Sequence, residues 1–145
     1  MGNDSNYLLY DDVLYLMNSL SKDFPELIST SSIGLSYQRL EIPLITLTLN
    51  SNSTSAMLIT GAHHARELAS VQLPMYTVLR ILHKYVQGDE EVRQMLLRHK
   101  LYIIPIVNVD GFKFISEHYL NNSFGSPNKS DPYVWKRKNM NTQYI

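Results

Sequence analysis

Residues 56–68 read AMLITGAHHAREL, an uncharged run that ends at a glycine and leads into two histidines, an arginine and a glutamate. The apolar residues 56–60 predict a strand, and the glycine after them marks a turn. His64 and Glu67, three residues apart, would then project from one turn at the carboxyl end of that strand. Because Zn²⁺ accepts both imidazole nitrogen and carboxylate oxygen, we interpret the pair as two ligands of one zinc ion.

The order of these residues separates the segment from the His-Glu-x-x-His helix of other metalloproteases, in which both histidines bind metal and the glutamate is the general base. Here Glu67 is better placed as a ligand, so a general base and a third ligand must come from elsewhere. His63 is the alternative to His64, because His63 and Glu67 would share one face of a helix.

The rest of the chain predicts a single α/β domain with a mixed sheet flanked by helices. A first helix should follow Asp11 or Asp12 and end before Pro25, and a long one, ended by Gly88, should bury Val71, Met75, Val78, Leu79 and Leu82. Two further helices are expected: one spans 69–87, and the other has Asp89 as its N-cap and reaches residue 97. The expected strands span 27–33, 42–49, 56–60 and 101–107, with a turn at Gly34.

Two further segments are expected to be irregular, and the remaining histidines are expected to take no part in the site. Asn108-Val109-Asp110-Gly111 predicts a tight turn in which Asn108 and Asp110 are turn formers rather than catalytic groups. Residues 116–133 are expected to form a loop. The remaining histidines should be ordinary: His83 and His99 in helical stretches, and His118 in that loop.

Composition excludes several classes of protein. Lys plus Arg and Asp plus Glu number 13 each, so no excess of positive charge indicates a nucleic-acid partner. The absence of cysteine excludes disulfides, thiolate catalysis and zinc sites built on cysteine. No apolar run approaches the roughly 18 residues that span a bilayer. The first six residues are polar, unlike the apolar core of a signal peptide, and the compartment is left open.

Residues 60–68, TGAHHAREL, resemble the metal-binding segment of the zinc metallocarboxypeptidases of the carboxypeptidase A/B type, whose pattern is Gly-x-His-x-Arg-Glu or Gly-x-His-His-x-Arg-Glu. The likeness continues in the family's order. Residues 108–111, NVDG, are similar to its Asn-Pro-Asp-Gly segment, with Val109 in place of proline. Residues 135–139, WKRKN, are similar to its Trp-Arg-Lys-Asn/Thr stretch with one extra lysine.

The resemblance implies a Zn²⁺ cofactor held by His64 and Glu67 and a reaction that removes carboxyl-terminal residues from peptides and proteins. It implies that Arg66 contacts substrate and that Arg137 both binds substrate and polarises the scissile carbonyl. Alignment through Trp135 instead of Arg-Lys-Asn would give that role to Lys136. It also favours an extracellular or secreted protein.

The likeness spans nearly the whole chain but only the amino-terminal half of such a catalytic domain, so residues 1–145 are expected to form one incomplete zinc carboxypeptidase-like domain. The family's third zinc ligand, carboxylate clamp and general base would lie after Ile145, which predicts a chain that is inactive alone. The alternatives are a non-catalytic remnant or truncated product that binds peptides or proteins, and an amino-terminal piece that pairs with a separate carboxyl-terminal half.

Overall fold

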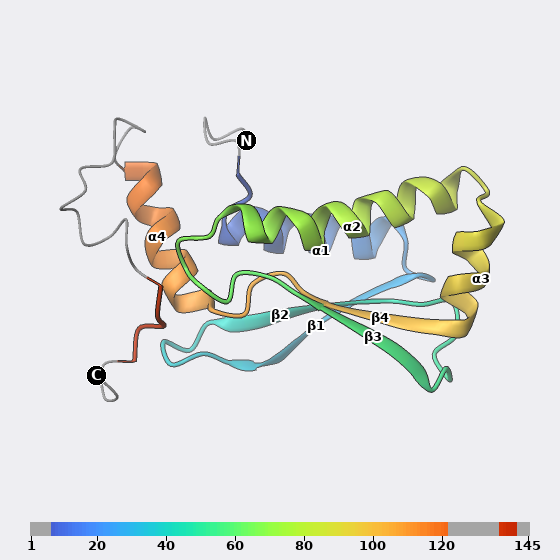
Figure 1. Cartoon of the computed structure of the whole chain (residues 1–145), viewed down its shortest axis with the longest axis horizontal. Coiled ribbons are helices and arrows are strands. Elements are labelled where there is room, and N and C mark those ends of the chain that lie inside the picture. Colours follow the sequence, from blue (N-terminus) through green and yellow to red (C-terminus); the bar gives the residue numbers. More distant parts are fainter. Residues whose placement is uncertain (1–6, 122–136, 142–145) are drawn as a thin grey trace.

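The computed structural model describes residues 7–121 and 137–141, which form a four-stranded mixed sheet with four helices (Figure 1). The elements are α1 (Tyr10–Asp23), β1 (Ile28–Leu35), β2 (Glu41–Leu47), β3 (Ser55–Thr60), α2 (Ala69–Val86), α3 (Glu90–Arg98), β4 (His99–Ile104) and α4 (Val109–Asn121). Helices α1 and α2 lie on one face of the sheet, and α3 and α4 lie at its two ends. This architecture confirms the predicted α/β fold class.

The strand order is β1-β2-β4-β3. Strands β1, β2 and β4 pair antiparallel, whereas β3 pairs parallel with β4, with Met57 opposite Leu101 and Thr60 opposite Ile104. A parallel pair needs a crossover connection, which α2 and α3 provide. The carboxyl ends of β3 and β4 therefore meet at the same edge of the sheet, and the segments that follow them start side by side.

The core lies between the sheet and helices α1 and α2. Alternate side chains of β2 and β4, among them Leu47 and Ile103, point to this side and are fully buried. They share one hydrophobic cluster with Val13 of α1 and Met75 of α2, both at 0% exposure. At roughly 25 cal/mol per Å² of apolar surface, this burial is the main force that holds the helices on the sheet.

Two helix starts are fixed by aspartates. The carboxylate of Asp12 accepts a hydrogen bond from the backbone N–H of Leu9, the residue before α1, at 3.0 Å. Asp89 accepts from the backbone N–H of Val92 at the start of α3, as predicted, and from Lys84 Nζ at 2.9 Å. The hydrogen bond from Lys84 is the main cause of a lowered pKa of Asp89.

Several local predictions are wrong. Gly34 lies inside β1 at a register shift, and the chain turns at Tyr37 and Gln38 instead. His99 is the first residue of β4 rather than part of a helix, and Leu79 is 40% exposed rather than buried. The first error arises because a glycine can break the register of a strand without ending it.

The predicted turn at residues 108–111 is also wrong, because α4 begins at Val109. Asp and Gly near the first turn of a helix give the same local signal as a turn, and only the residues packed around them decide between the two. As a consequence, residues 116–121 continue α4 instead of forming a loop, and residues 122–133 of the predicted loop lie outside the described residues.

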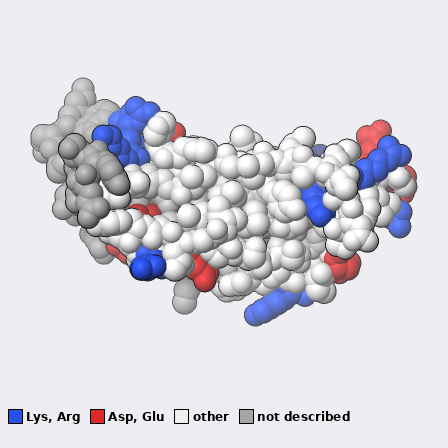
Figure 2. Space-filling view, turned by 90° about the horizontal axis from the view of Figure 1, so that it is seen from below, with Lys and Arg blue, Asp and Glu red and all other residues white. Residues whose placement is uncertain are grey.

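Although its sequence is apolar, β3 is an edge strand with exposed side chains. Met57 is 59% and Leu58 60% exposed, although three side chains of the parallel partner strand β4 are buried, namely Leu101, Ile103 and Ile104. The sheet face opposite α1 and α2 carries none of the described helices, and its middle is formed of uncharged residues (Figure 2). Within the described residues, none of the helices has the length and apolar character that crossing a membrane requires.

We predict that the isolated chain self-associates through β3, because an edge strand without charge, proline or bulge offers unpaired backbone groups to another chain. Replacing both Met57→Lys and Leu58→Lys should shift the sedimentation-velocity profile from oligomers to monomer. Tyr15→Lys, which places the same charge on an exposed position of α1, should leave the oligomers in place. A wild-type chain that sediments as a monomer at all concentrations would contradict this prediction.

We also predict that Gly61→Ala lowers the free energy of unfolding by about 1–3 kcal/mol, the usual cost of overpacking. A Cβ at this position would stand 2.7 Å from the Pro105 carbonyl oxygen and even closer to the Ser70 carbonyl oxygen, and both are backbone atoms that cannot rotate away. Urea denaturation measures the loss. The control is Thr54→Ala, at an exposed position directly before β3. Equal stability of the two variants would refute the close-packing argument.

Candidate metal site

The loop that follows β3 runs along the segment that follows β4, and three backbone hydrogen bonds join the two. Gly61 N–H donates to the Ile104 carbonyl at 2.9 Å, Val107 N–H to the Gly61 carbonyl at 3.0 Å, and Asn108 N–H to the Ala62 carbonyl at 3.0 Å. The loop therefore starts at the carboxyl edge of the sheet, where ligand crevices form in open α/β folds. The parallel pairing of β3 and β4 thus continues beyond the strands and sets the position of residues 61–67.

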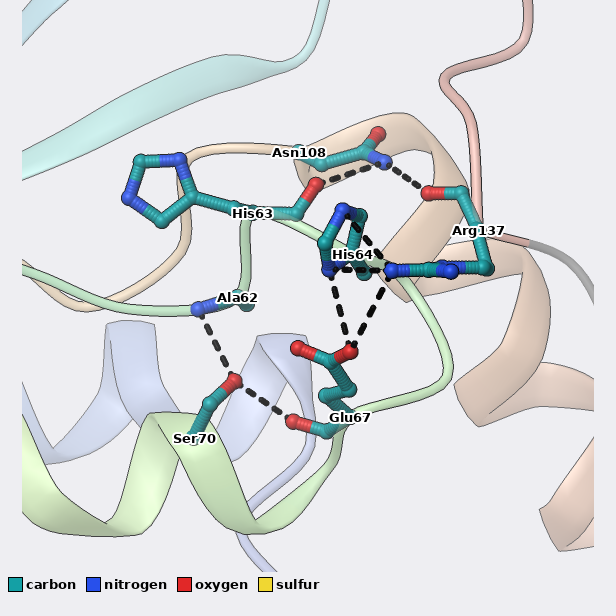
Figure 3. Close-up of polar contacts among 7 residues, drawn as sticks. All are labelled: Ala62, His63, His64, Glu67, Ser70, Asn108 and Arg137. Carbon is teal, nitrogen blue, oxygen red and sulfur yellow. Dashed lines mark hydrogen bonds and ion pairs between the residues drawn. The ribbon is translucent and has the colours of Figure 1, made fainter.

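The loop is closed at its other end by Ser70 in the first turn of α2. The Ser70 hydroxyl accepts a hydrogen bond from Ala62 N–H at 3.0 Å and donates one to the Glu67 carbonyl at 2.6 Å (Figure 3). Ala62 has a φ of +46°, a left-handed conformation that costs a residue with a Cβ about 1–2 kcal/mol. Such strain persists only where the surrounding contacts impose it, and it often occurs beside functional groups.

His64 and Glu67 face each other across this loop. His64 Nδ1 lies 3.0 Å from Glu67 Oε1, and the two side chains are 45% and 46% exposed. Two ligand atoms bound at about 2.0–2.2 Å to one tetrahedral zinc ion are about 3.3–3.5 Å apart. The observed separation is that of a hydrogen bond, and a few tenths of an ångström would convert it into the spacing of a ligand pair.

Arg137, from the second described segment, completes the cluster. Its Nη2 lies 3.3 Å from His64 Nδ1, 3.2 Å from His64 Nε2 and 4.0 Å from Glu67 Oε1. A neutral imidazole has an accepting lone pair on only one ring nitrogen, so Arg137 Nη2 cannot donate hydrogen bonds to both, and the guanidinium contacts the imidazole as a whole. The structure thus brings together three of the residues singled out from the sequence.

His63 points away from this cluster in Figure 3. Its Nε2 lies 2.9 Å from the hydroxyl oxygen of Thr60, at the end of β3. Of the two candidate histidines, His64 is therefore the one that meets Glu67. Arg66 lies half-exposed in the same loop, and Lys136, the alternative to Arg137, lies outside the described residues.

The donors present suit zinc in kind but not in number. One imidazole nitrogen and one carboxylate oxygen converge, whereas a catalytic zinc site has three protein ligands and an open position. Within residues 7–121 and 137–141, no group of three histidine, cysteine, aspartate or glutamate side chains could hold a metal ion. His64 and Glu67 would hold one side of the ion, and a further ligand has to come from outside the described residues.

A hollow of about 360 Å³ opens beside the cluster, between the loop, the start of α4 and the β1–β2 turn. It is lined by polar and apolar groups that include Tyr37, Ile42, His63, His64 and Arg137. Two cationic side chains, Arg137 and Lys138, border this space and favour a ligand with negative charge.

Asp110 has a role that the sequence did not indicate. It is 2% exposed, and its carboxylate accepts hydrogen bonds from the Ser36 hydroxyl and, at 3.1 Å, from Gln38 N–H. These contacts tie the β1–β2 turn to the first turn of α4. No local signal predicts them, because the partners lie 72 and 74 residues apart in the sequence.

Comparison with known proteins identifies the family of this chain. The zinc carboxypeptidase family model matches residues 13–143. Carboxypeptidase B of Astacus astacus is 29% identical over 110 residues, which cover 76% of this chain and 35% of that protein. Carboxypeptidase A6 of Homo sapiens is 32% identical over 112 residues, 75% of this chain and 25% of that protein. The chain thus spans about a third or less of the length of these relatives.

Solved structures show the same fold. Thrombin-activatable fibrinolysis inhibitor matches 92% of this chain with a TM-score of 0.73 and 21% identity, over 30% of its own length. Carboxypeptidase A of Helicoverpa armigera matches 96% of this chain with a TM-score of 0.69 and 23% identity, also over 30% of its length. Because the family model matches most of the residues of this chain, the chain belongs to the zinc carboxypeptidase family.

Proposed function

We propose that the chain is the amino-terminal part of a zinc-dependent metallocarboxypeptidase domain, in which His64 and Glu67 are metal ligands and Arg137 acts on the substrate carbonyl. The observation that carries the proposal is the convergence of His64 Nδ1, Glu67 Oε1 and Arg137 Nη2 within 4.0 Å of one another. The substrate is the carboxyl terminus of a peptide or protein.

Each side chain has a distinct part in this reaction. A bound Zn²⁺ supplies a water of lowered pKa and polarises the carbonyl group. The Arg137 guanidinium is a cationic hydrogen-bond donor that can stabilise the negative charge that develops on the carbonyl oxygen. Its 48% exposure leaves it accessible to a peptide. Arg66, in the same loop, would contact the substrate as a second cation.

The chain by itself is proposed to be inactive. Two ligands hold zinc weakly, and the described residues provide no third one within reach. The chain matches 35% of the length of the Astacus astacus enzyme, so most of that relative has no counterpart in these 145 residues. We propose that additional polypeptide provides the third ligand and the general base.

A second candidate is a non-catalytic peptide- or protein-binding module. Relatives that bear the name inactive metallocarboxypeptidase include that of Schizosaccharomyces pombe, 32% identical over 111 residues, and that of Saccharomyces cerevisiae, 25% identical over 112. In such a module the loop and the hollow would bind a peptide terminus without cleaving it.

A calorimetric zinc titration tests the ligand assignment. We expect the purified chain to bind Zn²⁺ with a Kd above about 1 µM, since only two ligands are available. His64→Ala and Glu67→Ala should each abolish the remaining binding. His63→Ala is the control and should bind like the wild type, because His63 faces Thr60. Loss of binding in His63→Ala but not in His64→Ala would reverse the assignment, and submicromolar affinity would show that two ligands suffice.

Peptidase assays test the reaction. The 145-residue chain should not cleave a blocked dipeptide, whereas a product of the same gene extended past Ile145, if the transcript encodes one, should cleave it in a chelator-sensitive manner. In that product Arg137→Ala should lower kcat by about 10²–10³, the effect of removing one donor to the developing oxyanion. Arg93→Ala, at an exposed position of α3 at the other end of the sheet, is the matched control. An extended protein that binds peptides without cleaving them would favour the second candidate, and chelator-sensitive cleavage by the short chain would refute its proposed inactivity.

A further inference from the structure

We propose that Asn108 is the positioning residue that holds Arg137 against the His64–Glu67 pair. Its importance for catalysis rests on the proposed function, but the contacts that support it do not. Sequence reasoning assigned Asn108 to a turn, and the structure gives its side chain partners in three separate segments.

The two oxygen atoms of Asn108 accept hydrogen bonds from the first turn of α4. The backbone carbonyl accepts a hydrogen bond from Phe112 N–H at 2.9 Å, and the side-chain Oδ1 accepts one from Gly111 N–H at 3.2 Å. This is the arrangement of a helix N-cap, for which asparagine is among the preferred residues. Aspartate or serine at this position would serve the helix as well.

The nitrogen atom of the same carboxamide contacts two segments of the candidate site. Asn108 Nδ2 donates to the Arg137 carbonyl at 2.9 Å and lies 3.4 Å from the His63 carbonyl (Figure 3). The two acceptors belong to segments 29 and 45 residues away in the sequence. Aspartate would set a carboxylate oxygen against two carbonyls, and serine would be too short to reach them. Only a carboxamide satisfies the helix and both segments together.

The Arg137 carbonyl is also the acceptor for Ala65 N–H, at 3.1 Å. The main chain of Arg137 is thereby fixed to the loop at the residue directly after His64. The side-chain contacts cannot do this alone, because ion pairs that are almost half exposed contribute only about 0–1 kcal/mol. The backbone contacts, in which Asn108 takes part, therefore fix the main chain from which the Arg137 side chain reaches His64 and Glu67.

Gly111 gives independent support for a close joint at this point. A Cβ on Gly111 would stand 2.8 Å from the Lys138 carbonyl oxygen, 2.9 Å from Ala65 Cβ and 2.9 Å from Asn108 Oδ1. A side chain at position 111 would force apart the very segments that Asn108 joins. The first turn of α4 thus provides both a hydrogen-bonding group and the space for residues 137–138 to approach.

The test compares Asn108→Asp and Asn108→Ser with the wild-type chain by NMR, without metal or substrate. Both variants keep an acceptor for the α4 N-cap and lose the donor to Arg137. We expect the Ala65 amide to exchange about tenfold faster than in the wild type, as for a loosened hydrogen bond. Nuclear Overhauser contacts between the Arg137 side chain and the His64 ring should disappear. Asp89→Ala, which removes the N-cap of α3 instead, is the control for general destabilisation and should retain those contacts.

Retention of the Arg137–His64 contacts in both Asn108 variants would overturn the inference, as would an equal loss in Asp89→Ala. If Asn108→Asp fails to fold, Asn108→Ser decides the outcome, because serine is a good N-cap and introduces no charge. The result is independent of the zinc titration. Loss of the contacts in both Asn108 variants supports the positioning role whatever the zinc titration gives. Loss of zinc binding in His63→Ala but not in His64→Ala would refute the ligand assignment of the proposed function and leave the positioning role intact.

Discussion

The parallel pairing of β3 with β4 is the constraint on which the candidate site depends. It places the carboxyl ends of two strands side by side, and hydrogen bonds between Gly61, Ala62, Val107 and their neighbours extend the pairing into the loops. Helices α2 and α3 form the crossover that makes this pairing possible, and their burial against the sheet stabilises it. Every side chain of the cluster is positioned relative to this junction.

Close approach of backbone segments is the second requirement, and glycine provides it at two positions. Gly61 lies against backbone oxygens of α2 and of the segment after β4, and Gly111 lies against residues 137–138. The left-handed conformation of Ala62 belongs to the same packing, because Ser70 holds both ends of the loop. The site is thus held together by backbone contacts, and its exposed charged side chains contribute little to the stability of the fold.

If the proposed function holds, additional polypeptide covers the exposed edge and face of the sheet. Strands whose sequences are almost continuously apolar are usually covered on both faces, yet β3 is an exposed edge and one sheet face carries none of the described helices. The chain matches 35% of the length of the Astacus astacus enzyme, which fits this observation. In the proposed function the same additional polypeptide would cover the sheet and complete the metal site.

The sequence alone was sufficient for the α/β class, the positions of most helices and strands, and the likeness carried by His64, Arg66 and Glu67. These features are local, since they depend on periodicity, N-cap residues and a short spacing. The helix in place of a turn after Asn108 and the partners of Asp110 were decided only by tertiary structure. They depend on segments 29 to 74 residues apart, and the local sequence carries no information about which distant segment will pack against it.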